Sequence, residues 1–265
     1  MMIWVDGEFR AAADAGFGAS DRGALLGDGL FETLCFDGGR VKDLDRHVDR
    51  VRRSASALDL PDPVDGIDIG VLCQELVARS QLTQAALRFT FTAGEGARGL
   101  VREATPEVSR RLSCAPLAPP PQDVRLHLTS IRRSASSPSA QHKTLSYIDN
   151  VLARREANKA GADMGLMLDT DGHVACADCA NIFWLSGERI YTPALNGAVL
   201  PGTVREALCE RFSIDECGHG PEALAAAEAA VVTNSLIGVV PVTAIGDRTL
   251  GANMDWVEAW REALA

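Results

Sequence analysis

The chain has 265 residues, of which 46% are hydrophobic and 23% charged, and its net charge is −10. This composition is ordinary for a soluble globular protein with one large domain or two small ones. An acidic surface disfavours general binding to nucleic acids or anionic membranes, so we expect neither as a partner. The first residues, MMIWVDGEFR, lack the basic and apolar regions of a signal peptide, and no apolar run reaches the roughly 18 residues of a membrane span. Seven cysteines at scattered spacings favour reduced thiols and a cytoplasmic protein.

The first half of the chain predicts strands with helices between them. Asp-Gly and Gly-Gly turns, helical spacing of apolar residues and β-branched or aromatic runs mark the elements. They are hairpins over 2–10 and 30–41, helices over 43–60 and 67–80, and strands over 85–94 and 107–113. The Pro-rich stretch 115–123 cannot continue a helix or a central strand. We therefore expect it to link a smaller N-terminal α/β domain, 1–114, to a larger C-terminal α/β domain, 124–265.

The second half predicts further strands and helices. They are a strand over 124–130, a helix over 143–161, several strands between 163 and 192, a helix over 200–212, two strands within 227–242, and a last helix over 253–264. Positions 145, 148 and 152 would form the apolar face of the helix that Lys143 opens. Strands dominate both halves, and no Gly-rich phosphate loop of the dinucleotide or ATP type is present. The fold class is therefore α+β or mixed α/β, not a doubly wound nucleotide fold.

Several residues could carry chemistry. Lys143 at a helix start is mildly mismatched to the helix dipole, and a buried lysine there would have a lowered pKa suited to Schiff-base chemistry. The alternative is an exposed lysine. The N–H groups of Thr203 and Val204, at the start of a helix, could bind an anion, or simply be capped. The same two readings hold for the turn 233–235, which could bind an anion or be an ordinary polar turn. Arg50 could be a ligand or a solvated arginine.

The stretch GHVACADCANIFWL, 172–185, sets Cys176 and Cys179 around Asp178. A Cys-x-x-Cys pair can bind zinc, but no second such pair and no nearby paired histidines complete four ligands. A thioredoxin-like redox pair opens a helix, whereas this pair lies between two predicted strands. Both readings remain minor alternatives.

Five blocks in this order resemble the fold-type IV pyridoxal-phosphate enzymes, which include D-amino-acid aminotransferases, branched-chain aminotransferases and aminodeoxychorismate lyases. The blocks are DRGALLGDGLFETL, HVDRVRRSASAL, HKTLSYIDNVLARREANKAGADMGLMLD, ANIFWL…IYTPALNGAVLPGTVRE and TNSLIGVVPV. The resemblance covers nearly the whole chain. It implies a two-domain fold like that of D-amino-acid aminotransferase, pyridoxal 5'-phosphate as cofactor, a homodimer, and an active site between the two halves.

The resemblance also implies roles for single residues. Lys143 would be the Schiff-base lysine, and the phosphate would be held by Arg50, the N–H groups of Thr203 and Val204, Asn234 and Ser235. In the family a glutamate five residues before the asparagine of the N-[IVL]-F strand holds the proton on the pyridine nitrogen. Counting back from Asn181 leads to Cys176. A neutral thiol cannot stabilise a pyridinium by charge. Asp178 is the other residue that could take this role.

The substrate would contact Phe31, Thr33 and Arg98. D-Amino-acid aminotransferases bind the substrate carboxylate with an aromatic hydroxyl, an arginine and a histidine; here the corresponding residues are Phe31, Arg98 and Leu100, so only the arginine is kept. FTAGEGARGL, GLFETL and TNSLIGVVPV look more like aminodeoxychorismate lyase. We therefore predict a lyase that releases pyruvate and forms 4-aminobenzoate for folate biosynthesis. The alternatives are a class IV aminotransferase acting on branched-chain or D-amino acids, and a cofactor-binding paralogue with weak catalysis because Cys176 replaces the glutamate.

Overall fold

The computed structural model describes residues 2–251 and 254–264. The chain divides into two compact units: the first runs to Ala118 and includes His142–Ser146, and the second begins at Pro119 and holds the remainder. The boundary lies inside the predicted linker, but the C-terminal domain is not the continuous stretch that was expected. The reason is strand pairing, because Phe31 N–H donates to Lys143 O at 2.8 Å and Leu145 N–H donates to Gly29 O at 3.0 Å.

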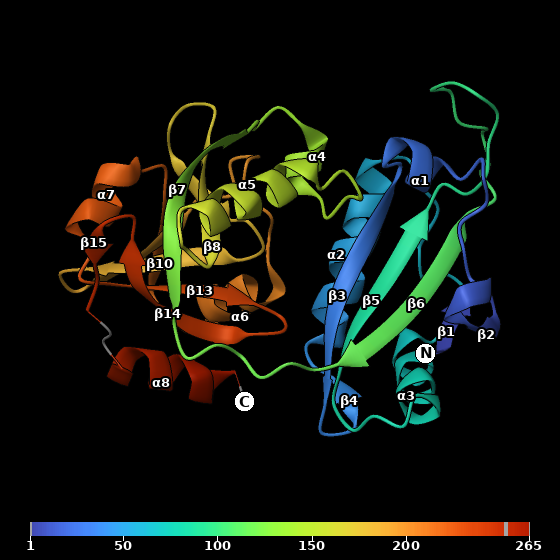
Figure 1. Cartoon of the computed structure of the whole chain (residues 1–265), viewed down its shortest axis with the longest axis horizontal. Helices are drawn as coiled ribbons and strands as arrows, with labels where there is room; N and C mark the ends of the chain where they lie inside the picture. Colours follow the sequence, from blue (N-terminus) through green and yellow to red (C-terminus); the bar gives the residue numbers. More distant parts are fainter. Residues whose placement is uncertain (1, 252–253, 265) are drawn as a thin grey trace. The chain divides into compact units, whose positions relative to one another are not determined.

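The first unit is built on a six-stranded antiparallel sheet in the order β2-β1-β6-β5-β3-β4 (Figure 1). The strands are β1 Met2–Val5, β2 Glu8–Ala11, β3 Gly29–Asp37, β4 Arg40–Val41, β5 Ala85–Thr92 and β6 Ser109–Pro116. Both predicted hairpins are confirmed. Their turns use Asp6-Gly7 and Gly38-Gly39, whose φ angles are all positive, as tight hairpin turns require.

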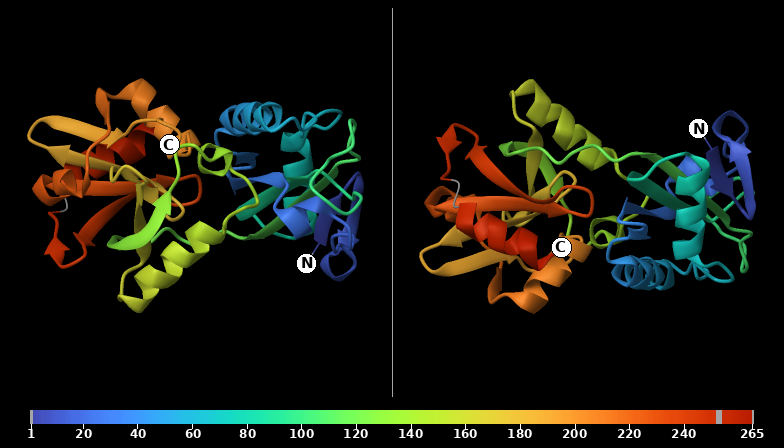
Figure 2. Two further views of the ribbon diagram at one scale, coloured as in Figure 1. Left: turned by 90° about the horizontal axis from the view of Figure 1, so that it is seen from above. Right: turned by 90° about the horizontal axis from the view of Figure 1, so that it is seen from below.

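Helices α2 (Leu44–Ala57) and α3 (Ile69–Arg79) confirm the two helices expected in this half. Val51 of α2 and Leu76 of α3 pack with Leu34, Phe89 and other buried residues of the strands in one core. Both helices therefore cover the same face of the sheet (Figure 2). The short elements η1 (Ala12–Asp14) and α1 (Arg22–Leu26) lie between β2 and β3.

The second unit holds a nine-stranded mixed sheet in the order β12-β11-β10-β13-β14-β7-β8-β9, with β15 paired to β14. The strands are β7 Val124–Arg133, β8 Met164–Asp169, β9 Val174–Ala177, β10 Asn181–Ser186, β11 Arg189–Pro193, β12 Ile214–Cys217, β13 Ala229–Asn234, β14 Gly238–Ile245 and β15 Arg248–Thr249. Because β9 lies next to β10 and β11, the sheet curls around its own apolar core. The predicted strands of this half are confirmed.

The helices of the second unit are α4 Pro138–Gln141, α5 Ile148–Lys159, α6 Thr203–Arg211, α7 Pro221–Ala226 and α8 Met254–Ala263. Helices α6 and α8 confirm two predictions; positions 252 and 253 lie outside the described residues. The expected helix over 143–161 was wrong at its start, because α5 begins only at Ile148.

The predicted apolar face of α5 was also wrong. Ile148 is 63% exposed, whereas Ala153 and Ala157 are fully buried. The cause is close approach to β8, since a Cβ added at Gly165 would lie 2.5 Å from the Ala153 carbonyl oxygen. Only small residues fit there. The fold is mixed α/β, as predicted, and among the described residues no helix has the length and hydropathy needed to cross a membrane.

Candidate functional site

Lys143 lies in an extended segment that contacts two elements of the first unit, β3 and α2. Thr144 forms an antiparallel bridge with Leu30 of β3, and His142 Nδ1 lies 3.1 Å from Ser54 Oγ of α2. Gly29 makes this pairing possible, because a Cβ there would lie 2.4 Å from the Phe91 carbonyl oxygen and 2.9 Å from Leu145 Cδ1. One glycine of the block DRGALLGDGLFETL, 21–34, is thus explained by the space that the lysine segment needs.

The Lys143 side chain contacts the ring of Phe31. Its Nζ lies 4.1 Å from the ring centre, and the Arg88 guanidinium carbon lies 3.7 Å from the same centre. Thr33 is paired with Arg88 across β3 and β5. Because side chains alternate along a strand, Phe31 and Thr33 point to the same face of the sheet. The structure therefore brings Lys143, Phe31 and Thr33 together and adds Arg88, which the sequence analysis missed.

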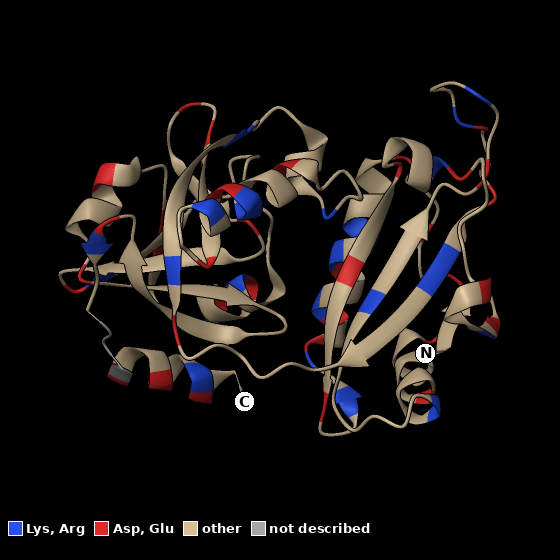
Figure 3. Ribbon diagram, in the orientation of Figure 1, with Lys and Arg blue, Asp and Glu red and all other residues tan. Residues whose placement is uncertain are grey.

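Arg50 is not a solvated arginine but part of a buried group with Glu32 and His47. Its Nε and Nη2 donate to the two Glu32 oxygens at 2.8 and 2.5 Å, and His47 Nδ1 donates to Glu32 Oε2 at 2.7 Å. Burial alone would raise the pKa of Glu32. The hydrogen bonds and charges of Arg50 and His47 outweigh this effect and lower the pKa from 4.5 to about 2. Figure 3 shows the basic residues of α2 beside β3. This network holds the guanidinium in one orientation.

The ionised Glu32 predicts an acid dependence of stability. A carboxyl whose pKa falls from 4.5 to about 2 on folding stabilises the fold fully above pH 4.5, and this contribution is lost as the pH falls toward 2. It amounts to about 3 kcal/mol. Urea unfolding between pH 5 and pH 2.5 should show a steeper loss for the natural protein than for Glu32→Gln. Asp62→Asn, at an exposed ion pair with Arg52, is the control and should leave the slope unchanged. Equal slopes for the natural protein and Glu32→Gln would contradict the prediction.

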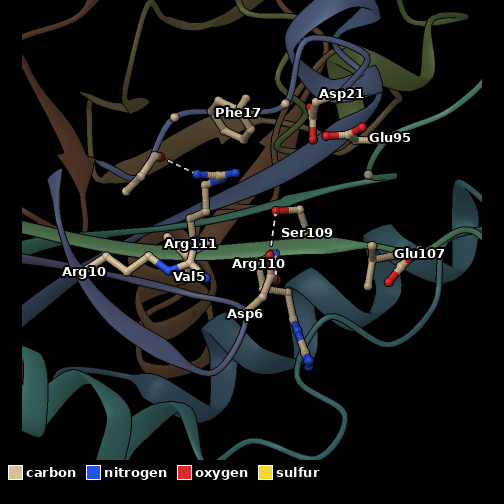
Figure 4. Close-up of a pocket in the computed structure, with 15 residues that line it drawn as sticks. Val5, Asp6, Arg10, Phe17, Asp21, Glu95, Glu107, Ser109, Arg110 and Arg111 are labelled. Carbon is tan, nitrogen blue, oxygen red and sulfur yellow. Dashed lines mark hydrogen bonds between the residues drawn. The ribbon is translucent and has the colours of Figure 1, made fainter. Parts of the chain in front are cut away.

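Arg98 is exposed, and among the described residues it makes no hydrogen bond or ion pair. The first unit also has a cavity of about 610 Å³, and none of the predicted site residues lines it. Figure 4 shows its lining. In it Arg111 donates to the Ala15 carbonyl and lies 4.0 Å over the Phe17 ring, which fixes the loop 15–18. The acidic residues lining this cavity are Asp6, Asp21, Glu95 and Glu107. The same lining also holds Arg10, Arg110 and Arg111, so its acidic and basic charges nearly balance.

In the second unit, the Asp178 side chain is held by hydrogen bonds within the fold. Its two carboxylate oxygens accept from Arg154 at 2.5 and 2.7 Å, and one also accepts from Gly165 N–H at 2.6 Å. Its backbone carbonyl accepts from Asn150 Nδ2 at 2.5 Å. These bonds tie α5 to β8 and engage both oxygens of the Asp178 carboxylate.

Cys176 is 6% exposed and packs in a small apolar cluster with Met167, Ala198 and Val199. Burial raises the pKa of its thiol, although the nearby Arg133 guanidinium opposes this rise. Arg133 is itself buried and donates to the Ala198 and Ala140 carbonyls at 2.7 and 2.5 Å. The thiol is therefore neutral at neutral pH.

The start of α6 meets the ends of β10 and β13. Gly202 is the N-cap of α6 and has no side-chain cap, and its α-carbon lies against the side chain of Asn181. Asn181 is paired with Thr233 on β13. The Thr233 hydroxyl is buried and has no hydrogen-bond partner among the described residues. Asn234 follows directly, and its Oδ1 accepts from Leu236 N–H and Ile237 N–H. Thr203, Val204, Asn234 and Ser235 thus belong to neighbouring segments, as an anion site requires.

The family described as amino-transferase class IV has a model that matches residues 29–245. The chain belongs to this family. Aminodeoxychorismate lyase of Bacillus subtilis is 29% identical over 260 residues, covering 95% of this chain and 89% of that protein. The structure of 4-amino-4-deoxychorismate lyase from Pseudomonas aeruginosa is 30% identical with a TM-score of 0.85, covering 99% of this chain and 97% of that one. The pyridoxal-phosphate-bound form of a hypothetical aminotransferase from Mycobacterium tuberculosis, at 23% identity, TM-score 0.84 and coverages of 100% and 97%, shares the fold.

The described residues were also compared with the ligand sets of metal sites. Within the described residues, one group of His, Cys, Asp and Glu side chains could hold an ion, namely Asp169, Asp171 and His173. Asp169 Oδ1 already accepts from the backbone N–H groups of Asp171 and His173, so it fixes the turn between β8 and β9. The group includes neither Cys176 nor Cys179, and we assign no zinc to that pair.

Glu32 and Arg88, which lie beside predicted site residues, were not predicted from the sequence. Both carried a signal, because each is the one charged residue in the stretch around it, GLFETLCF or AALRFTFT. A charged side chain in a largely apolar strand needs an oppositely charged partner or a ligand, because burying an unpaired charge costs free energy.

Proposed function

We propose that the protein is a pyridoxal-phosphate-dependent aminodeoxychorismate lyase that releases pyruvate and forms 4-aminobenzoate. The observation that carries the proposal is the 30% identity to the Pseudomonas aeruginosa lyase over 99% of the chain. The arrangement around Lys143 supports an enzyme that binds a carbonyl cofactor, since the amine lies on the Phe31 ring at the surface of a rigid sheet.

The second unit fits the phosphate end of this cofactor. A dianion matches the uncapped start of α6 and the buried Thr233 hydroxyl, which has no hydrogen-bond partner among the described residues. Thr203 and Val204 would donate N–H groups, and Asn234 and Ser235 would add polar groups from the turn after β13. Arg50 in the first unit would add charge-assisted bonds. At the pyridine end the fit is partial, because Cys176 supplies no charge.

When bound, the cofactor supplies an electron sink. Lys143 would hold it covalently and, once displaced by the substrate amine, would move protons to and from the substrate. Phe31 would support the lysine amine, and Thr33 would border the same space. The Glu32–His47 pair would keep the Arg50 guanidinium aimed in one direction.

A class IV aminotransferase acting on branched-chain or D-amino acids is the second candidate, favoured by the family itself. Phe31 lacks a hydroxyl, and Leu100, 82% exposed, cannot donate a hydrogen bond, so the carboxylate trap of D-amino-acid aminotransferases is incomplete. The neutral Cys176 further disfavours transamination and also supports a weakly active paralogue.

One experiment separates these candidates. The protein loaded with pyridoxal phosphate is given 4-amino-4-deoxychorismate, and 4-aminobenzoate and pyruvate are measured together. Parallel reactions hold D-alanine or L-leucine with 2-oxoglutarate. Equal amounts of the two lyase products, with slower transamination, support the lyase. Transamination without 4-aminobenzoate supports the aminotransferase, and neither activity in a loaded protein supports the paralogue.

We further propose a homodimer in the cytoplasm that serves folate biosynthesis. Ile148 and Val151 on α5 are 63% and 57% exposed, which supports an apolar contact with a second copy. In such a dimer, the exposed Arg98 side chain could contact the second copy of the chain. Light scattering after gel filtration should give twice the mass of one chain, and the mass of a single chain would exclude the dimer.

Arg50→Ala is expected to weaken pyridoxal-phosphate binding by roughly 10- to 100-fold, because each charge-assisted hydrogen bond contributes about 1.5–3 kcal/mol. The dissociation constant is measured by cofactor absorbance. Arg53→Ala, an exposed arginine on the same helix, should bind normally. Arg50→Lys keeps the charge beside Glu32 and should give an intermediate value. An unchanged dissociation constant in a folded Arg50→Ala protein would remove Arg50 from the site.

A further inference from the structure

Helix α2 carries a buried polar stripe on the side that packs against β3. His47, Arg50 and Ser54 are spaced by three and four residues, so they share one face of the helix. They are 2%, 5% and 3% exposed. A buried polar group needs a partner, because leaving it unpaired costs free energy. Glu32 of β3 binds the first two of these side chains, and the Ser54 hydroxyl has its partner in another part of the chain.

That partner is His142, at the point where the chain returns to the first unit. Its Nδ1 lies 3.1 Å from Ser54 Oγ. The imidazole is half-buried, and burial lowers its pKa, so the ring is neutral at neutral pH. A neutral imidazole and a hydroxyl each offer a donor and an acceptor, so this contact needs no charge. The bond therefore ties the residue before Lys143 to the helix that carries Arg50.

A three-residue turn links His142 to Lys143. Thr144 N–H donates to the His142 carbonyl oxygen at 2.9 Å, which places Lys143 at the centre of the turn. The Lys143 carbonyl oxygen in turn accepts from Phe31 N–H at 2.8 Å. Because the backbone is bonded on both sides of the lysine, few free torsions separate its side chain from the His142 ring. A His142 released from α2 would let the lysine stem turn away from the Phe31 ring, where its Nζ lies 4.1 Å from the ring centre.

We propose that His142 is a positioning residue, which through Ser54 fixes the direction in which Lys143 presents its amine. The inference rests on the proposed function, because it takes Lys143 as the residue that holds the cofactor. Loss of the bond should slow the reaction of the amine with an aldehyde, in which the nitrogen attacks the carbonyl carbon, a C=N bond forms and the oxygen leaves as water. Anion binding by Arg50 should not change, since its bonds to Glu32 remain.

The test uses the full chain without cofactor and two probes. Pyridoxal phosphate carries an aldehyde, whereas pyridoxine phosphate carries an alcohol at the same position and binds without a covalent bond. His142→Leu and Ser54→Ala should each slow C=N formation with pyridoxal phosphate, followed by absorbance, by roughly 2- to 10-fold. The dissociation constant of pyridoxine phosphate, measured by calorimetry, should stay unchanged. The double variant should be no slower than the slower single variant, because both changes remove the same bond.

His142→Asn keeps a polar group close to the position of Nδ1 and should recover most of the rate. His127→Leu makes the same change at a histidine of the second unit, which lies 3.7 Å from Glu156, and should react at the natural rate. A second measurement needs no cofactor. Carbon-13 methylation labels the lysine amines, and nuclear magnetic resonance should show a more mobile Lys143 in His142→Leu, with the signals of the other lysines unchanged.

The proposal is overturned if His142→Leu forms the C=N bond at the natural rate, if it weakens pyridoxine phosphate binding to the same extent, or if the Lys143 signal is unchanged. Failure of the lyase function gives a different pattern: C=N formation still depends on His142, but 4-amino-4-deoxychorismate yields no 4-aminobenzoate. If the natural protein forms no C=N bond with pyridoxal phosphate, the cofactor assignment fails, and the mobility of Lys143 alone decides the role of His142.

Discussion

Lys143→Ala is expected to abolish covalent cofactor attachment and to lower turnover by about 10³-fold or more, since acid–base catalysis alone contributes about 10²–10⁴-fold. The loss should be chemical and not structural. The segment is held by backbone pairing, with Phe31 N–H on Lys143 O and Leu145 N–H on Gly29 O, and a substitution of the side chain leaves these bonds in place. The thermal unfolding midpoint of the variant should therefore stay near that of the natural protein.

The attachment site can be identified by covalent labelling, because the chain has only three lysines, Lys42, Lys143 and Lys159. Borohydride reduction of the loaded protein should fix the cofactor to the peptide that contains Lys143. Lys42 is ion-paired with Asp37 and Lys159 is exposed at the end of α5, so Lys159→Ala is a control that should be labelled and active. Label on Lys42 or Lys159 in the natural protein would exclude Lys143 as the attachment site.

Much of the fold was predictable where local signals and tertiary packing agree. The Asp6-Gly7 and Gly38-Gly39 turns fix two hairpins, and Asp68, whose side chain accepts from Val71 N–H, starts α3 near the expected place. The segment 143–147 could not be predicted in this way. Its residues tolerate a helix, but pairing with β3 overrides that local tendency.

The candidate site shows the same division. Motif order predicted roles for Lys143 and Arg50, but a motif does not state what a residue contacts. Glu32 and Arg88 are neighbours of those residues only because β3 pairs with β5 and packs on α2. Likewise, Cys176 and Asp178 are both close to the expected carboxylate position in sequence. Only the bonds from Arg154 and Gly165 show that Asp178 is already occupied.

Cys176→Glu is expected to raise the protonated fraction of the cofactor's pyridine nitrogen several-fold or more, because one pKa unit corresponds to about 1.4 kcal/mol. The family resemblance places a glutamate at this position, next to that nitrogen. Here a buried thiol, whose pKa burial raises, is neutral and supplies no charge. The nearby Arg133 guanidinium makes the local potential more positive, which also disfavours a pyridinium. Cys176→Gln has the same size as the glutamate variant without its charge and is the matched control.

The two reactions should respond differently to this change. Transamination depends on a strong electron sink throughout, so the single-turnover rate with amino acids should rise several-fold in Cys176→Glu and stay low in Cys176→Gln. Elimination of the enolpyruvyl group ends in an aromatic ring, and this product stability lessens the demand on the sink, so the lyase rate should change less. Nitrogen-15 resonance of labelled cofactor reads the protonation directly. An unprotonated nitrogen in a folded Cys176→Glu protein would show that position 176 does not face the ring, because Asp178 is bound to Arg154 and cannot mask the effect.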